Sequence, residues 1–143
     1  MAGISKVELM LKTAKESDAG TDGWVYLGIA GRELHVDTTD NDFEPGAEFT
    51  YVFGQDANVL DAERNDPTAP RLNTDDLDRF PLYIRFEPKN GSDNWGLDEA
   101  TVLVNPGTDL PHRYSNPAVI GAADHRKIWL GQKTGKMLHL RRY

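Results

Sequence analysis

The sequence contains no cysteine and no long apolar run. Without cysteine the chain has neither disulfide bonds nor thiol chemistry, so packing alone must hold the fold together. No stretch approaches the roughly 20 apolar residues that a membrane-spanning helix requires, and residues 1–6 lack the apolar segment of a signal peptide. These absences predict a soluble protein and favour the cytoplasm as its location.

Basic residues are the scarcer charge. The chain has 16 Lys and Arg against 23 Asp and Glu, a formal net charge of −7. Nucleic-acid phosphates are bound through clusters of Lys and Arg, so this balance argues against a nucleic-acid partner. The bases gather in residues 113–143, which favours a molecule with an acidic body and a basic end. A chain of 143 residues is long enough for one core, and we expect a single domain over residues 1–143.

Short segments of alternating or apolar side chains, separated by Gly, Pro, Asn and Asp, predict an all-β protein. The expected strands are residues 7–13, 24–29, 33–37, 47–53, 82–87, 101–104, 128–131 and 136–141. The last two are expected to pair as a closing hairpin within residues 127–142, and residues 108–124 to be mostly irregular. No long helical period is present, so the pattern favours an antiparallel eight-stranded β-sandwich.

Residues 55–79 are the longest stretch without a clear period. They combine many Asp residues with Pro67 and Pro70. This composition predicts an extended acidic excursion on the surface, mobile enough to be the first site of proteolytic cleavage.

Antiparallel strands place successive loops at alternating ends of a sandwich. Residues 14–22, 38–46 and 88–97 should therefore share one end, with the excursion at the other. The shared end carries the oxygen side chains of Asp18, Thr21, Asp22, Asp40, Asp42, Glu44 and Asp93. Carboxylates brought together repel one another unless a cation offsets them, and Ca²⁺ suits flexible loops rich in oxygen ligands. Ordinary turn-capping hydrogen bonds are the alternative role for these residues.

Four motifs resemble those of the PLAT/LH2 family in order and spacing: Ala19–Asp22, Asp42–Gly46, Asp93–Trp95 and Ile128–Leu130. Members of that family attach a β-sandwich to lipoxygenases, lipases, bacterial phospholipase toxins and polycystins. The resemblance implies a module for membrane-lipid or protein contacts, often with Ca²⁺. Its calcium ligands would fall on Asp18, the Gly20 carbonyl, Thr21, Asp22, Asn41, Asp42 and Asp93. The long excursion and the lack of an attached catalytic domain depart from the family pattern.

Trp95 lies beside the acidic end, where an exposed ring would contact a lipid interface or stack on a sugar. Core packing is the alternative for this ring. The same features leave a carbohydrate-binding module open as a second function. No nucleophile elbow or catalytic triad is present, so we expect a noncatalytic protein and keep a small enzyme as the third option.

Overall fold

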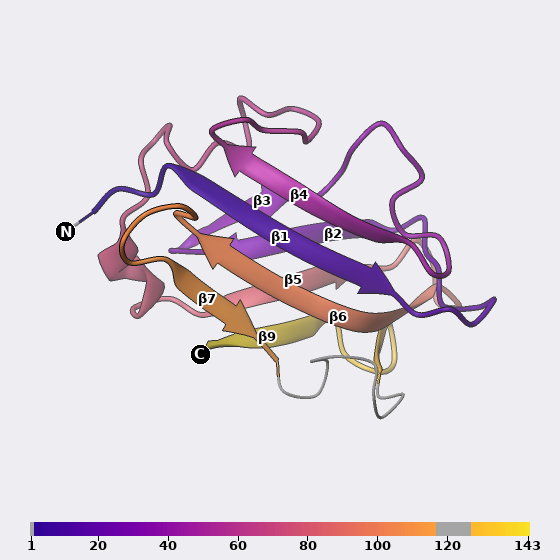
Figure 1. The fold of residues 1–143 in the computed structure, drawn as a ribbon. Helices are drawn as coiled ribbons and strands as arrows, with labels where there is room; N and C mark the ends of the chain where they lie inside the picture. Colours follow the sequence, from indigo (N-terminus) through magenta and orange to yellow (C-terminus); the bar gives the residue numbers. More distant parts are fainter. Residues whose placement is uncertain (1, 117–126) are drawn as a thin grey trace.

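The computed structural model describes residues 2–116 and 127–143, which are built almost entirely from antiparallel strands (Figure 1). The strands are β1 (Lys6–Thr13), β2 (Trp24–Ile29), β3 (Arg32–His35), β4 (Glu48–Gly54), β5 (Leu82–Glu87), β6 (Asn94–Val104), β7 (His112–Ser115), β8 (Ile128–Gly131) and β9 (Met137–Arg142). A short 3₁₀ helix, η1, covers Thr74–Leu77. No helix in this part of the chain has the length and apolar character needed to cross a membrane.

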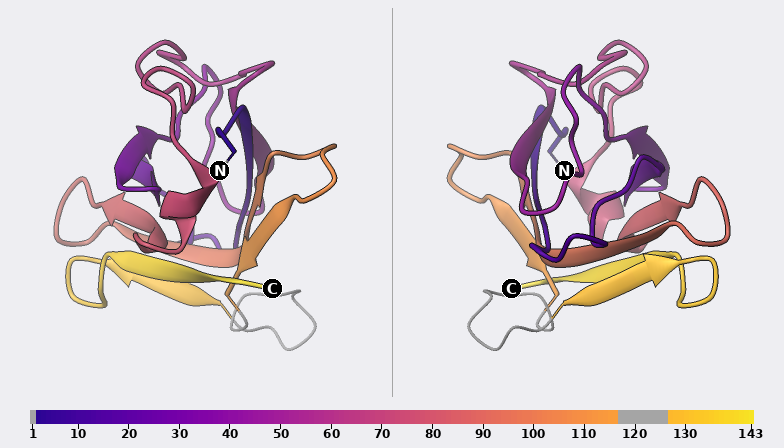
Figure 2. Two further views of the ribbon diagram at one scale, coloured as in Figure 1. Left: turned by 90° about the vertical axis from the view of Figure 1, so that its left-hand side faces the viewer. Right: turned by 90° about the vertical axis from the view of Figure 1, so that its right-hand side faces the viewer.

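The strands follow the order β3-β2-β5-β9-β7-β6-β1-β4, and β8 pairs with β6 outside this path. Seen along the strands in Figure 2, the sheet curls so that its β2–β3 side faces its β1–β4 side, with β9 below. Alternate residues of each strand point into the space between these sides. In β1 the buried residues are Val7, Leu9 and Leu11, and in β5 they include Ile84 and Phe86. The core therefore fills the inside of the curl.

The β-sandwich prediction is confirmed, but the expected count of eight strands is wrong. The described residues form nine strands, because β7 lies within the stretch expected to be irregular. Only four residues long, β7 is held by pairing with the preceding strand β6 and with β9, which is distant in sequence. β6 is also longer than expected, since it begins at Asn94 rather than Thr101. The remainder of the stretch expected to be irregular, residues 117–124, lies outside the described residues, and one domain across the whole chain stays a prediction.

The predicted closing hairpin is also wrong. β8 pairs with β6, whereas β9 pairs with β5 and β7. Within residues 127–142 the two segments meet in a single bridge between Gly131 and Gly135. Twist and curl of the sheet direct β8 and β9 to different neighbours, which a hairpin signal in the local sequence does not reveal.

The 55–79 excursion is packed against the sandwich and is not a loose loop. Arg32 of β3 donates to the carbonyls of Asp66 and Arg64, both at 2.6 Å, and the backbone N–H of His35 donates to Asn65 Oδ1 at 2.7 Å. Leu77 of η1 is buried in the core. The polar groups of the segment hydrogen-bond to the neighbouring β3 edge, while its expected mobility stays a prediction that proteolysis would test.

Candidate functional site

Three loops meet at the end of the sandwich where β1 ends and β2 begins, as the antiparallel alternation predicts (Figure 1). Gly46 N donates to Ala14 O at 3.0 Å, and Thr21 N donates to Phe43 O at 2.9 Å. The third loop joins them through side chains, because Thr21 Oγ1 donates to Asp93 Oδ1 at 2.6 Å. We call these three loops, residues 14–23, 36–47 and 88–93, the loop end. The excursion lies at the opposite end.

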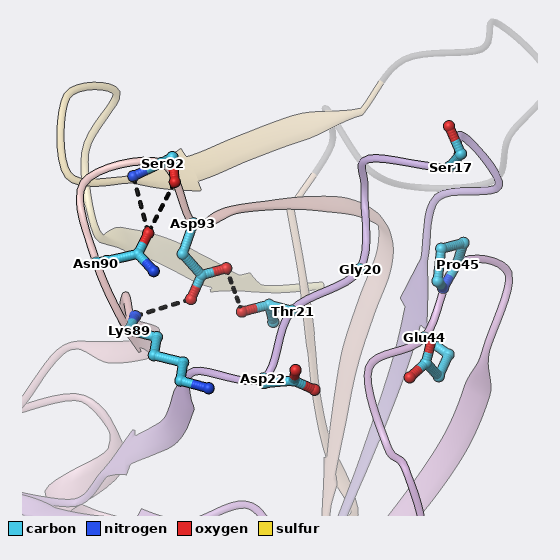
Figure 3. A pocket seen from close by; sticks show the side chains of 10 residues that line it. All are labelled: Ser17, Gly20, Thr21, Asp22, Glu44, Pro45, Lys89, Asn90, Ser92 and Asp93. Atoms are coloured by element: carbon cyan, nitrogen blue, oxygen red, sulfur yellow. Dashed lines mark hydrogen bonds between the residues drawn. The ribbon is translucent and has the colours of Figure 1, made fainter.

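A polar hollow of about 420 Å³ opens between the three loops (Figure 3). This first hollow is lined by Ser17, Gly20, Thr21, Asp22, Glu44, Pro45, Lys89, Asn90, Ser92 and Asp93. The carboxylate of Asp93 is held from both sides, since Oδ1 accepts the Thr21 hydroxyl and Oδ2 accepts the backbone N–H of Lys89 at 2.8 Å. Thr21 Oγ1 in turn accepts the backbone N–H of Gly23 at 2.9 Å. One wall of the hollow is thus fixed by hydrogen bonds before any ligand arrives.

Two other carboxylates of the first hollow are free to bind a ligand. Figure 3 shows the side chains of Asp22 and Glu44 extending into the hollow from different loops. Neither carboxylate forms a hydrogen bond or ion pair with the residues that the structure describes. The Lys89 side chain, on the third loop, is likewise without an ion pair among those residues. The hollow therefore presents two unpaired negative charges beside one unpaired positive charge.

A second, smaller hollow of about 160 Å³ lies on the other side of Thr21 and Asp22. It is lined by residues 21–24, 35–37 and 40–43. Asp42 is turned inward and is only 6% exposed, and its carboxylate accepts the backbone N–H of Thr38 at 2.9 Å and also the Thr38 hydroxyl. Asp42, one of the predicted calcium ligands, therefore already uses its carboxylate to stabilise its own loop.

The surroundings of Asp42 shift the titration of two neighbours. Burial raises the pKa of Asp37, and the adjacent Asp42 carboxylate raises it further. The hydroxyl of Tyr51 is buried nearby and has no hydrogen-bond partner among the described residues. Burial, together with the negative charges of Asp42 and Asp37, raises the pKa of Tyr51. The inner wall of the second hollow therefore concentrates negative charge away from water.

The nine predicted calcium ligands divide among three places. Gly20, Thr21, Asp22, Glu44 and Asp93 line the first hollow, and Asp40, Asn41 and Asp42 line the second, together with Thr21 and Asp22. Asp18 lines a separate third hollow. In residues 2–116 and 127–143, no three His, Cys, Asp or Glu side chains lie close enough together to hold a metal ion. The loops converge as expected, but their carboxylates do not form one acidic centre.

Trp95 does not line the surface, so the prediction of an exposed membrane or ligand contact is wrong. Its side chain is 0% exposed, and Nε1 donates to Thr13 Oγ1 at 3.0 Å. The rings of Phe43 and Phe86 pack on it, with centroids at 5.1 Å and 5.8 Å. Because β6 begins at Asn94, Trp95 is a strand residue on the inward face and anchors the loop end from below.

The sequence analysis missed several residues of the loop end: Trp24, Asp37, Lys89 and Trp129. Trp24 is 49% exposed at the rim of the second hollow. Trp129 lines the third hollow, and Lys89 the first. The positions of Trp24, Asp37 and Lys89 at strand ends that share one edge of the sandwich were available from the predicted strands. The predicted strands did not reveal which of the tryptophans faces outward, because that depends on the strand register.

Known proteins resemble this chain in sequence. No family model matches it. Over 110 residues, or 71% of the chain, it is 31% identical to a phospholipase C from Clostridium novyi, and over 108 residues it is 28% identical to a phospholipase C from Clostridium haemolyticum. The matched region is 24% of each relative, so the chain spans about a quarter of their length.

Solved structures resemble the chain over nearly its whole length. Alpha toxin from Clostridium absonum matches 97% of this chain with a TM-score of 0.60 and 23% identity, over 32% of the toxin. Coral 8R-lipoxygenase, described as activated by calcium through a C2-like domain, matches 96% of this chain with a TM-score of 0.55 and 14% identity, over 17% of that enzyme. At these identities the match establishes the fold, a PLAT-like β-sandwich.

Proposed function

We propose that this chain is a noncatalytic member of the PLAT/LH2 family that binds membrane lipid surfaces with the help of Ca²⁺. The observation that carries the proposal is the first hollow, where Asp22 and Glu44 present unpaired carboxylates beside the braced carboxylate of Asp93. The similarity to clostridial phospholipases C and to a calcium-activated lipoxygenase supports this reading.

The first hollow is lined by oxygen groups of the kind that Ca²⁺ prefers, although in the described residues its carboxylates lie too far apart to share one ion, so binding would require the three loops to draw together. Carboxylate oxygens of Asp22, Glu44 and Asp93 would be joined by the hydroxyl of Thr21 and the carbonyl of Gly20, all hard oxygen ligands. The chain has no Cys, and no His within residues 2–116 and 127–143 lines this hollow, which disfavours Zn²⁺. Mg²⁺ demands a near-ideal octahedron, whereas three separate loops suit the variable coordination of Ca²⁺. A bound Ca²⁺ would neutralise the carboxylates and offer open positions to lipid phosphate.

The second hollow extends the same proposal. Asp40 and Asn41 line it beside the inward-facing Asp42, and Asp22 lies between the two hollows. We infer that these residues assist cation binding from the neighbouring loop. Asp18 contributes least, because it lines the third hollow and not the first. The nine-residue ligand set of the sequence analysis is thus proposed in a graded form, centred on Asp22.

Residues other than the carboxylates would help the loop end meet a membrane. The unpaired ammonium group of Lys89 is suited to an anionic lipid phosphate. The exposed ring of Trp24 at the second hollow is suited to the interfacial region, where the amphipathic indole is favoured. We infer that the loop end, and not the basic residues Arg141 and Arg142 of β9, faces the lipid.

The noncatalytic part of the proposal rests on the side-chain partners. In the described residues, the Ser and Thr hydroxyls that form side-chain hydrogen bonds pair with carboxylates, amides, an indole or a carbonyl, and none pairs with a histidine. An activated nucleophile requires such a base within reach. The likeness to a phospholipase C extends over a quarter of that enzyme, so its activity is not carried to this chain.

Co-sedimentation with vesicles of phosphatidylcholine and phosphatidylserine tests the proposal. The chain should pellet with vesicles in millimolar Ca²⁺ and remain in the supernatant with chelator. The double variant Asp22→Asn/Glu44→Gln should lose the calcium-dependent fraction. Asp75→Asn, which removes an exposed carboxylate of η1 at the opposite end, is the matched control and should bind like the wild type. Equal binding with and without Ca²⁺, or equal loss in both variants, would overturn the calcium-assisted mechanism.

A further inference from the structure

The third hollow has a composition unlike the other two. Its volume is about 420 Å³, and it is lined by Asp18, Ser92, Asn94, Trp129 and Thr134. These residues come from the β1–β2 loop, the β5–β6 loop, the start of β6, β8 and the turn before β9. Only one carboxylate faces it, and an indole forms part of its wall. The calcium proposal does not use this arrangement.

The position of Trp129 is built into the pairing of β8 with β6. Trp129 lies opposite Gly96 in the register, and a Cβ at Gly96 would lie 3.2 Å and 3.3 Å from atoms of the indole six-membered ring. Glycine at position 96 therefore lets the indole lie close against the sheet, while the ring remains partly exposed and lines the hollow. The same pairing sets Asn94 opposite Gly131, whose missing Cβ leaves space for the Asn94 side-chain oxygen.

The polar groups around the indole keep hydrogen-bonding capacity. Asp18 is exposed, and its carboxylate forms no hydrogen bond or ion pair with the described residues. Asn94 Nδ2 donates to Ser92 O at 3.3 Å, which leaves its second amide hydrogen available. The Ser92 hydroxyl donates to Asn90 Oδ1 at 2.9 Å and can still accept. A carboxylate, an amide and two hydroxyls thus surround one aromatic wall.

We propose that the third hollow binds a sugar ring. A pyranose has an apolar C–H face that packs on an indole, and hydroxyl groups that donate to a carboxylate and exchange hydrogen bonds with amides and hydroxyls. The volume lies within the range of roughly 300–1,000 Å³ typical of small-ligand sites. The inference goes beyond the proposed calcium-assisted lipid binding, because it uses a different hollow and a neutral ligand.

Other ligand classes match these groups less well. An anionic phosphate would be repelled by Asp18, since no Lys or Arg among the described residues lines the hollow. A quaternary ammonium group would suit the indole and the carboxylate. It cannot donate a hydrogen bond, however, so Ser92, Asn94 and Thr134 would be left without a role. A glycolipid headgroup and a free glycan both supply such a ring, and the experiments below distinguish these two sources.

Tryptophan fluorescence and a glycan array test this proposal, both in chelator so that the calcium sites play no part. At least one array glycan should bind, and the same free oligosaccharide should give a saturable fluorescence change. Asp18→Asn should weaken binding about tenfold, because it replaces a charge-assisted hydrogen bond with a neutral one. Trp129→Ala should abolish it. Asp75→Asn, which removes an exposed carboxylate of η1 at the opposite end of the sandwich, should leave both affinity and signal unchanged.

Vesicles separate the two sources of the sugar. The chain is mixed in chelator with phosphatidylcholine vesicles that either lack or contain a glycolipid bearing the array-positive glycan. Binding only to the vesicles that contain the glycolipid supports a glycolipid headgroup as the source. Binding to the free glycan but to neither kind of vesicle supports a soluble or protein-linked glycan. Asp18→Asn and Trp129→Phe are milder changes, and they keep the proposal testable if Trp129→Ala fails to fold. Absence of any array glycan, full affinity in both of these variants, or a fluorescence response to choline chloride in place of sugars would overturn the proposal. Calcium-dependent binding to sugar-free vesicles would be unaffected by any of these results.

Discussion

Asp22 and Asp66 lie at opposite ends of the sandwich, in two stretches that are both rich in Asp. Asp66 Oδ1 accepts the backbone N–H of Thr68 at 2.8 Å and the Thr68 hydroxyl at 2.6 Å, and these bonds lower the pKa of Asp66. Asp22 forms no hydrogen bond or ion pair with the described residues and lines two hollows. The excursion uses its carboxylate to shape the backbone, whereas the loop end leaves its carboxylate open to solvent.

Other acids of the excursion follow the pattern of Asp66. Asp76 pairs with Arg79 at 3.1 Å, and Asp78 approaches Arg142 of β9 at 3.7 Å. Similar composition therefore gives several carboxylates paired with neighbouring residues in the excursion, and at the loop end both braced carboxylates, Asp42 and Asp93, and open ones, Asp22 and Glu44. Composition alone does not show which carboxylates are paired and which are open, because this depends on the hydrogen-bond donors that the fold places beside each carboxylate.

The largest expected effect concerns the anchors beneath the two ends. Trp95→Ala should lower the free energy of unfolding by about 3–5 kcal/mol, since it empties the core under the loop end and leaves the Thr13 hydroxyl without its donor. The matched change Leu77→Ala beneath the excursion should cost about 2–5 kcal/mol, towards the lower value. Urea unfolding measures both. A Trp95→Ala midpoint equal to that of the wild type would mean that the loop end does not depend on this ring.

Calcium should stabilise one end only. If Ca²⁺ binds the folded state alone, a free concentration one hundredfold above Kd adds about 2.7 kcal/mol to the free energy of unfolding. The melting temperature should rise accordingly, and Asp22→Ala and Asp42→Ala should each reduce that rise. Asp75→Ala at the opposite end should leave it unchanged. A melting curve insensitive to both Ca²⁺ and chelator, with no heat of binding in calorimetry, would assign the loop-end carboxylates to turn capping.

The packing of the excursion has a prediction of its own. Asn65 is buried, accepts the backbone N–H of His35, and donates to Asp61 O at 3.0 Å. Asn65→Ala should cost about 1–3 kcal/mol, because it leaves these buried groups without partners. Limited proteolysis should spare residues 55–79 in the wild type and cut them early in the variant. Early cutting there in the wild type would show that the contacts to β3 open readily in solution.

The smallest expected effect is on acid stability. Because the folded-state pKa of Asp66 lies below its usual value, its stabilisation is present above that value and is lost as the pH falls through the lowered pKa. Asp66→Asn should therefore destabilise the protein at neutral pH by less than about 1 kcal/mol, as solvent screens this exposed group. The difference from the wild type should vanish in acid. Melting curves recorded from pH 7 to pH 2 test this, and a difference that persists at the lowest pH would point to lost packing.

Much of the fold could be read from the sequence. The expected bounds of β2, β5 and β8 coincide with those observed, since period-two and fully apolar segments depend only on local residues. The assignment of three loops to one end also holds, because it follows from antiparallel alternation once the strands are known. Seven of the nine candidate ligands were chosen by this logic, and Gly20 and Asn41 were added by the family resemblance; eight of the nine line the first two hollows.

The errors share one origin. The β9 partner of β7, the separate partners of β8 and β9, and the pairing of the early part of β6 with β8 all join segments far apart in the chain. The early start of β6 reversed the interpretation of Trp95, since one residue of register decides which face a side chain occupies. The contacts of Asp93 with Thr21 and of Trp129 with Gly96 arise in the same way.

The sequence by itself determined the strand segments, the shared end of three acidic loops and the resemblance to PLAT/LH2 domains. Only the tertiary structure decided which carboxylates are braced and which stay open, which tryptophans are buried and which line a hollow, and that the excursion is packed against β3. The physical reason is that strand periodicity is encoded in neighbouring residues, whereas a side chain's partners and exposure are set by long-range strand register.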